Sequence, residues 1–163
     1  AEDHIMAAIL SPVTQKIYLF KDYRVWCFSS LNSLEAGYPK QLSGYNTPYN
    51  PIAALYHENR IWLLKGDLLF PFDEKTVQFV TSISPKRVNQ LFPGVPGQVR
   101  TAFTYNNRHY FFTESDRKVY VWNQQTNRLE AGYPKPMEHG WFACSNKNDY
   151  NQRRSALLSR NNH

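Results

Sequence analysis

Histidine and cysteine are the side chains of this sequence best suited to metal binding and nucleophilic catalysis, and they are widely separated. They are His4, His57, His109, His139, His163, Cys27 and Cys144. His57 precedes Glu58, but the second histidine of a His-Glu-x-x-His zinc helix is missing. No glycine-rich phosphate loop occurs, and no local nucleophile signature surrounds a serine or a cysteine. The sequence therefore predicts that the chain is not an enzyme, and its histidines are expected on the surface or in turns.

Positive charge is concentrated at the C-terminal end. The formal net charge of the chain is +6, and residues 145–163 carry half of it. The charged residues there are Lys147, Arg153, Arg154, Arg160 and the single acid Asp149. A basic segment of this kind attracts polyanions. We therefore interpret residues 145–163 as a flexible polar tail that binds a polyanion, or else as a solvated end that keeps the chain in solution.

The composition is typical of one folded domain. The 163 residues are 42% hydrophobic and 20% charged, which suits a single domain and is too apolar for a disordered chain. No run approaches the roughly 18 apolar residues of a membrane span, so no transmembrane segment is expected.

Internal repetition is the most informative property of the sequence. Residues 34–40 and 129–135 both read Leu-Glu-Ala-Gly-Tyr-Pro-Lys, a shift of 95 positions. A diverged copy lies between them, because residues 17–22, 61–66 and 109–114 align with one another. The small-residue strands before these segments begin at positions 6, 52 and 100, which gives pitches of 46 and 48. The sequence therefore contains three related units.

Each unit contains three runs of aromatic and β-branched residues separated by turn residues, as in an antiparallel meander. Pro71 lies inside one run and predicts an outer strand there, because proline donates no backbone hydrogen bond. The alanines of the first run suit a strand close to an axis. Repeats of this length made of antiparallel strands are typical of a β-propeller. A β-sandwich with accidental similarity between its parts is the alternative.

The units resemble the hemopexin-like repeat, which occurs in hemopexin, in vitronectin and in the C-terminal domains of matrix metalloproteinases. The most specific matches are residues 18–22, 37–40, 92–96 and 132–135, and residues 141–144 are similar to the end of the family's last blade. The resemblance covers about residues 4–144. It implies an all-β propeller domain over residues 1–144, with repeats at about 4–48, 50–97 and 98–144.

The sequence departs from the family in the number of blades. The family normally has four blades, whereas three repeats are visible here. The chain is then a fragment, a three-repeat variant, or one part of a propeller that another chain completes. Because an open propeller exposes two unpaired blade faces, self-association is expected. The family's usual disulfide makes a bond between Cys27 and Cys144 one alternative. Two free cysteines are the other, because Cys27 lies in a strand where the family tends to place a basic residue.

The resemblance further implies a central channel lined by backbone carbonyl groups. The residues at the start of the inner strands are Met6, Ala8, Ile52, Ala54, Arg100 and Ala102. Carbonyl oxygens are ligands that calcium accepts, so calcium and sodium are candidate channel ions. Arg100 beside the axis instead favours an anion such as chloride, water or an empty channel. The alternative is that its side chain turns outward to the solvent. Haem, which hemopexin binds, is not expected.

We therefore predict a secreted, extracellular binding or adhesion module without catalytic activity. Its expected partners are a protein, a matrix component or a glycosaminoglycan, and no nucleic acid partner is expected. Lys147, Arg153, Arg154 and Arg160 are the candidate polyanion-binding residues. The alternative function is a carrier or storage protein that holds an ion, haem or a polyamine in the central channel.

Overall fold

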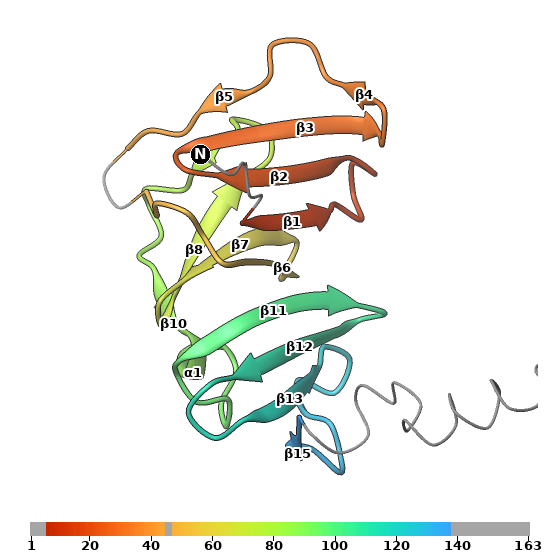
Figure 1. The fold of residues 1–163 in the computed structure, drawn as a ribbon, viewed down its shortest axis with the longest axis vertical. Helices are drawn as coiled ribbons and strands as arrows, with labels where there is room; N and C mark the ends of the chain where they lie inside the picture. The colour runs from red at the N-terminus through yellow and green to blue at the C-terminus, as the bar shows by residue number, and fades with distance from the viewer. Residues whose placement is uncertain (1–5, 45–46, 138–163) are drawn as a thin grey trace, which may run out of the picture.

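The structure is a computed structural model that describes residues 6–44 and 47–137. These residues form three antiparallel sheets that follow one another along the chain, and we call them blades 1 to 3 (Figure 1). Blade 1 contains β1 (Ala7–Leu10), β2 (Ile17–Lys21), β3 (Arg24–Ser30), β4 (Ser33–Leu34) and β5 (Lys40–Gln41). Blade 2 contains β6 (Ala53–His57), β7 (Arg60–Lys65), β8 (Leu68–Asp73), β9 (Gln78–Phe79) and β10 (Lys86–Arg87), and it is followed by the short helix α1 (Val88–Leu91). Blade 3 contains β11 (Val99–Tyr105), β12 (Arg108–Thr113), β13 (Lys118–Asn123), β14 (Arg128–Leu129) and β15 (Lys135–Pro136).

Figure 1 shows β1, β6 and β11, the innermost strands of the three blades, on the side of each blade that faces the common axis. This all-β arrangement is the propeller that the repeats predict. Among the described residues, no helix is long and apolar enough to cross a membrane.

Two-residue turns connect the innermost strand of a blade to the next one in blades 2 and 3. Glu58 and Asn59 join β6 to β7, and Asn106 and Asn107 join β11 to β12, all four with positive φ values between 50° and 59°. Positive φ at both central residues matches the twist of the flanking strands, and asparagine tolerates this backbone better than most residues do. The turn residues in the sequence therefore fix where these hairpins reverse.

The outer part of each blade differs from the predicted three-stranded meander. The third strand carries two short additional partners, so Pro71 does not lie in an outermost strand. In blade 2, β9 pairs with the end of β8 and β10 with its beginning, which leaves Pro71 between them. Its carbonyl accepts a hydrogen bond from Val80 N (2.9 Å). The missing N–H of Pro71 therefore falls at a gap in the outer pairing rather than at the sheet edge.

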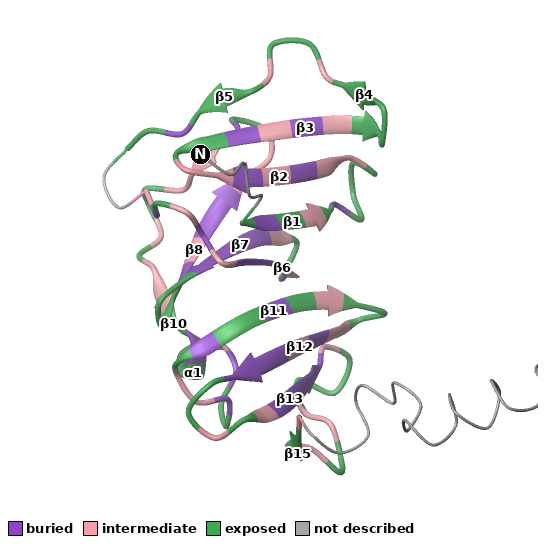
Figure 2. Cartoon of the chain, in the orientation of Figure 1, coloured by how far each residue is buried: buried purple, intermediate pink, exposed green. Residues whose placement is uncertain are grey.

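Apolar contacts between neighbouring blades form two cores. The core between blades 1 and 2 includes Phe20 and Phe72, whose ring centroids are 5.3 Å apart. The core between blades 2 and 3 surrounds Phe92, which follows α1 on the connection between these blades and is fully buried. Blade 2 therefore packs on both of its faces. Figure 2 shows the result as a continuous buried run along β7, whereas buried and partly exposed residues alternate along β2 of blade 1.

The repeated seven-residue segment adopts the same conformation in blades 1 and 3. Gly37 and Gly132 have φ values of 81° and 83°, a region that favours glycine. The peptide bonds before Pro39 and Pro134 are both cis.

Side-chain contacts of the segment recur as well. Lys40 lies over the ring of Tyr38 at 4.9 Å, and Lys135 lies over Tyr133 at 4.7 Å. Glu35 pairs with Lys16 at 3.1 Å, and Glu130 pairs with Arg108, at the equivalent position, at 2.7 Å. Identical sequence thus gives the same outer edge on two blades.

Replacing Phe92 by alanine is expected to lower the free energy of unfolding by about 3–5 kcal/mol, because it leaves a cavity between two sheets that both contact the ring. Urea denaturation monitored by circular dichroism measures the change. Leu31→Ala is the control, since Leu31 is 84% exposed and its loss should change the free energy by less than about 0.5 kcal/mol. A loss below about 1 kcal/mol for Phe92→Ala would contradict the role given to this ring.

Candidate functional site

A cavity of about 430 Å³ lies where the innermost strands of the three blades meet, and we call it the axial cavity. Its lining residues are Ala8, Ile9, Leu10, Pro12, Ala54, Tyr56, Phe103, Thr104, Tyr105, Asn106, Asn107 and Gln124. The alanines come from β1 and β6, as expected for strands near an axis. The carboxamide groups come from the turn after β11 and from the turn after β13, and hydroxyl groups come from β6 and β11. The site therefore combines an apolar, aromatic wall with amide side chains at one end.

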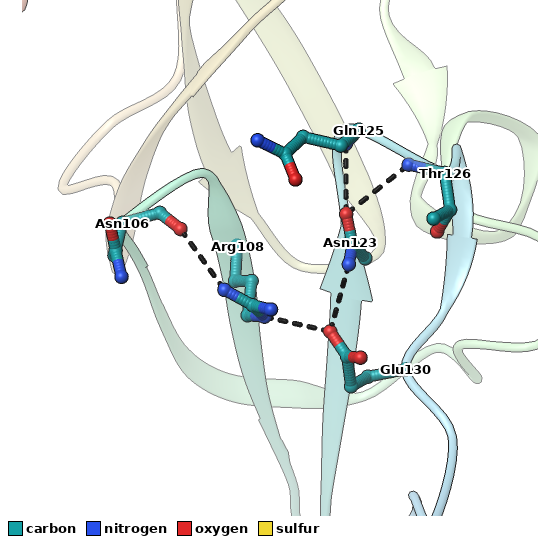
Figure 3. A network of polar contacts seen from close by, with 6 residues as sticks. All are labelled: Asn106, Arg108, Asn123, Gln125, Thr126 and Glu130. Carbon is teal, nitrogen blue, oxygen red and sulfur yellow. Dashed lines mark hydrogen bonds and ion pairs between the residues drawn. The ribbon is translucent and has the colours of Figure 1, made fainter.

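Hydrogen bonds within blade 3 hold these two turns in place (Figure 3). Arg108 donates from Nε to Glu130 Oε2 (2.7 Å), and Asn123 donates from Nδ2 to the same oxygen (3.0 Å). Asn123 Oδ1 accepts hydrogen bonds from the backbone N–H groups of Gln125 (2.9 Å) and Thr126 (3.2 Å).

A backbone bond then connects the two turns directly. Gln124 N donates to Asn107 O at 3.0 Å. The two turns are therefore joined to each other and to the sheet, so that Asn107 and Gln124 come together at the cavity.

Two histidines that the sequence places on the surface or in turns are instead buried together between blades 2 and 3. His109 in β12 is fully buried, and His57 at the end of β6 is nearly so. His109 Nε2 lies 3.2 Å from His57 Nδ1, and His109 Nδ1 lies 2.8 Å from Thr104 Oγ1. Thr104 Oγ1 also accepts a hydrogen bond from Tyr56 N at 3.1 Å. The expectation for His57 and His109 is therefore wrong.

The repeat geometry explains why this pair escapes sequence analysis. Its members lie 52 positions apart and occupy non-equivalent positions in their repeats, so only the stacking of blade 3 on blade 2 brings them together. Phe92 lies against both rings, with centroid distances of 4.7 Å to His57 and 5.1 Å to His109. The aromatic neighbours make the surroundings apolar.

Burial in these surroundings disfavours the charged form of both rings. Burial, with a smaller contribution from His57, lowers the pKa of His109 to about 3. Burial also lowers the pKa of His57, against the opposing effects of Glu58 and of a hydrogen bond with Gln124. Glu58 Oε1 is 3.8 Å from His57 Nε2. Both rings are therefore neutral at neutral pH, and each uses a ring nitrogen to bind the other.

The residues predicted to line the channel have different environments. Ala8 and Ala54 line the axial cavity, whereas Ala102 is buried in the core between blades 2 and 3 and Ile52 packs against that core. Arg100 is exposed and is the extra residue of a β-bulge between Val99 and Thr101. Met6 is exposed, and its N–H donates to Phe20 O at 3.2 Å. Ion binding by the carbonyl groups of these residues stays a prediction.

No group of three or more His, Cys, Asp or Glu side chains within residues 6–44 and 47–137 is arranged to hold a metal ion. Cys27 is buried in β3, where burial raises the pKa of its thiol. Cys144 and the tail residues Lys147, Arg153, Arg154 and Arg160 lie outside the described residues. The disulfide and the polyanion site therefore stay predictions, as do the repeat boundaries and the limits of the tail.

The outward side of blade 1 is an apolar surface, which we call the blade 1 outer face. Cross-strand pairing places its side chains in two rows on the side of the sheet opposite blade 2. One row contains Ala8, Leu19 and Trp26. The other row contains Leu10, Ile17, Phe28 and Leu34. All seven residues are partly or largely exposed, with Leu34 at 46%. This sheet is therefore apolar on both faces but covered on one.

The outward side of blade 3 is more fully covered. Val119 and Val121 are buried beneath aromatic side chains that include Tyr110 and Tyr133. The exposed ring of Phe103 stacks on Tyr110 with a centroid distance of 4.8 Å and an interplanar angle of 15°. The expectation of two exposed faces thus fits blade 1 better than blade 3.

The fold defines this chain as a three-bladed hemopexin-like propeller, and comparisons with known proteins agree. The family model described as Hemopexin matches residues 5–48. Matrix metalloproteinase-19 from Homo sapiens is 34% identical over 138 residues, which cover 85% of this chain and 26% of the relative. This chain therefore spans about a quarter of the length of the curated relatives it matches.

Solved structures show the same fold at low sequence identity. A plant albumin from Cicer arietinum that shows hemagglutination has a TM-score of 0.62 at 17% identity, with 86% of this chain and 73% of that chain covered. The hemopexin fold protein CP4 from cow pea has a TM-score of 0.61 at 14% identity, with 84% and 69% covered. The chain is thus built from hemopexin-like repeats, as its sequence motifs predict.

Lowering the pH from about 6.5 to about 5 is expected to destabilise the protein. Histidines in the unfolded chain bind protons below about pH 6.5, whereas His57 and His109 in the folded chain have lowered pKa values. The unfolded chain therefore binds more protons, and the free energy of unfolding falls as the pH drops through this range. Urea denaturation at a series of pH values measures the slope.

The double variant His57→Gln with His109→Gln should show a flatter slope, whatever its stability at pH 7. The control is Glu130→Gln. Glu130 has a lowered pKa, so its contribution is lost only below about pH 4.5. A slope that stays the same in the double variant would contradict the assignment.

Proposed function

We propose that this chain is a non-catalytic, extracellular binding module that holds a protein partner against the blade 1 outer face. The proposal rests on one observation, which is how far each sheet face is covered by a neighbouring blade. Blade 2 is packed on both faces, whereas blade 1 presents seven apolar side chains on a face that no described residue covers. Contiguous exposed apolar surface of this kind is typical of interaction sites.

The shape of this surface indicates the kind of partner. It is an antiparallel sheet face whose row of Ala8, Leu19 and Trp26 ends in a large aromatic side chain, and neither apolar row contains a charged residue. Apolar and aromatic residues concentrate at the centres of protein interfaces. A partner with an apolar sheet or helix face fits this surface, and a second copy of the chain is one such partner.

A small-ligand carrier is the second candidate, and the axial cavity favours it. Its volume lies within the range of about 300–1,000 Å³ that small-molecule sites have. Haem is not supported as the ligand, because ring nitrogens of His57 and His109 face each other. A polyamine is not supported either, since no carboxylate lines the cavity.

Replacing Leu34 by glutamate should weaken association through the blade 1 outer face at least tenfold, since a carboxylate then lies in an apolar contact. Sedimentation velocity over a wide range of protein concentrations measures the association of the chain with itself. The matched control is Leu31→Glu, because Leu31 lies in the turn between β3 and β4. Equal effects of the two variants, or a wild-type chain that stays monomeric and binds no apolar dye, would contradict the proposal.

Removal of residues 145–163 should lower the salt concentration at which the chain elutes from immobilised heparin, because the tail supplies half of the net positive charge. Contacts between basic side chains and a polyanion weaken steeply with salt. Elution on a salt gradient, with the full-length chain as reference, measures the change. If the truncated chain elutes at the same salt concentration, the tail residues do not form the polyanion site.

A further inference from the structure

The axial cavity has a lining that selects for an uncharged ligand. Its polar side chains are hydroxyl and carboxamide groups, and none of its lining residues carries a charge at neutral pH. A charged ligand would lose water in this cavity without gaining an opposite charge, which is costly. A ligand that fits must therefore be neutral and must offer both apolar surface and hydrogen-bonding groups.

The aromatic wall provides the apolar contact. Tyr105 is 68% exposed and lies two positions after Phe103 on the same side of β11. The stacking of Phe103 on Tyr110 fixes the orientation of the Phe103 ring. Exposed aromatic rings beside a cavity suit a ligand with a flat apolar face, because they offer large contact area with little conformational entropy to lose.

The amide end of the cavity provides the polar contacts. Asn107 and Gln124 come together there through a bond between their backbones, the network around Glu130 holds both turns, and the Gln124 side chain is also hydrogen-bonded to His57. Groups that are held in place before a ligand arrives lose less entropy on binding. Carboxamides both donate and accept hydrogen bonds, so they match vicinal hydroxyl groups, which also do both.

We propose that the axial cavity binds one sugar ring of a neutral saccharide, with Tyr105 and Phe103 against its apolar face and Asn107 and Gln124 bonded to its hydroxyl groups. A pyranose combines an apolar C–H face with a rim of uncharged hydroxyls, which is the combination that this lining requires. The axial cavity shares Ala8 and Leu10 with the blade 1 outer face, whereas Leu34 does not line the cavity.

The test is saturation-transfer NMR and isothermal titration calorimetry on the full chain. The probes are galactose, mannose and N-acetylglucosamine with their linear trisaccharides, and spermine serves as the charged comparison. Tyr105→Ala removes the exposed ring. Asn107→Gly removes a carboxamide, and glycine adopts the φ value of 58° at this position without strain. Each variant should weaken saccharide binding at least tenfold.

The matched control is Tyr49→Ala, because Tyr49 is 48% exposed but packs at a tilt against Tyr23 and does not line the cavity. This variant and Leu34→Glu should bind the saccharide as the wild-type chain does. The proposal is overturned if none of the saccharides binds, if spermine binds more tightly than every saccharide, or if Tyr105→Ala and Asn107→Gly bind normally. Loss of self-association in Leu34→Glu with saccharide binding intact separates the two proposals.

Discussion

Phe92 occupies the point where blade 2, blade 3 and the connection between them meet, and its contacts show what holds the molecule together. Its ring lies 5.0 Å from Phe111 and 5.5 Å from Trp122, in addition to the two histidines. These rings come from blade 2, blade 3 and the connection between them, and they share one buried core. The apolar face of one blade is therefore stable only because the next blade covers it, as in other repeat proteins.

This dependence explains the position of the candidate sites. Within residues 6–44 and 47–137, blade 1 has a neighbouring blade on one side only, so its outer face is exposed while the equivalent positions of blade 2 are buried. The axial cavity has the same origin, since β1, β6 and β11, the innermost strands of the three blades, all contribute residues to its lining. Both surfaces thus follow from the number of blades rather than from any single residue.

The periodicity of the sequence predicted the three sheets, their order and the small residues near the axis. The recurrence of residues 34–40 at 129–135 predicted blades 1 and 3, and the alignment of residues 17–22, 61–66 and 109–114 predicted the sheet between them. Contacts between blades were harder to predict. His57 and His109 carry no local signature, and the gap in the pairing of β8 that accommodates Pro71 depends on two later strands, β9 and β10.

The residues proposed to bind a ligand were missed for a related reason. Asn106 and Asn107 form the turn between β11 and β12, but nothing in the sequence indicated that Gln124 lies beside them. That proximity requires the hydrogen bond between the two turns. A turn of polar residues next to an aromatic strand end was the available signal, and its direction relative to the axis could come only from the fold.

The recurrence of one edge structure on blades 1 and 3 also affects how other molecules meet this chain. The lysine-over-tyrosine pairs next to β5 and β15 lie at opposite ends of the molecule in Figure 1. The same arrangement of a lysine over a tyrosine ring is therefore present twice on one chain. Two equivalent surfaces on one chain allow a bivalent partner to bind both of them, and this linkage raises the avidity above the affinity of a single contact.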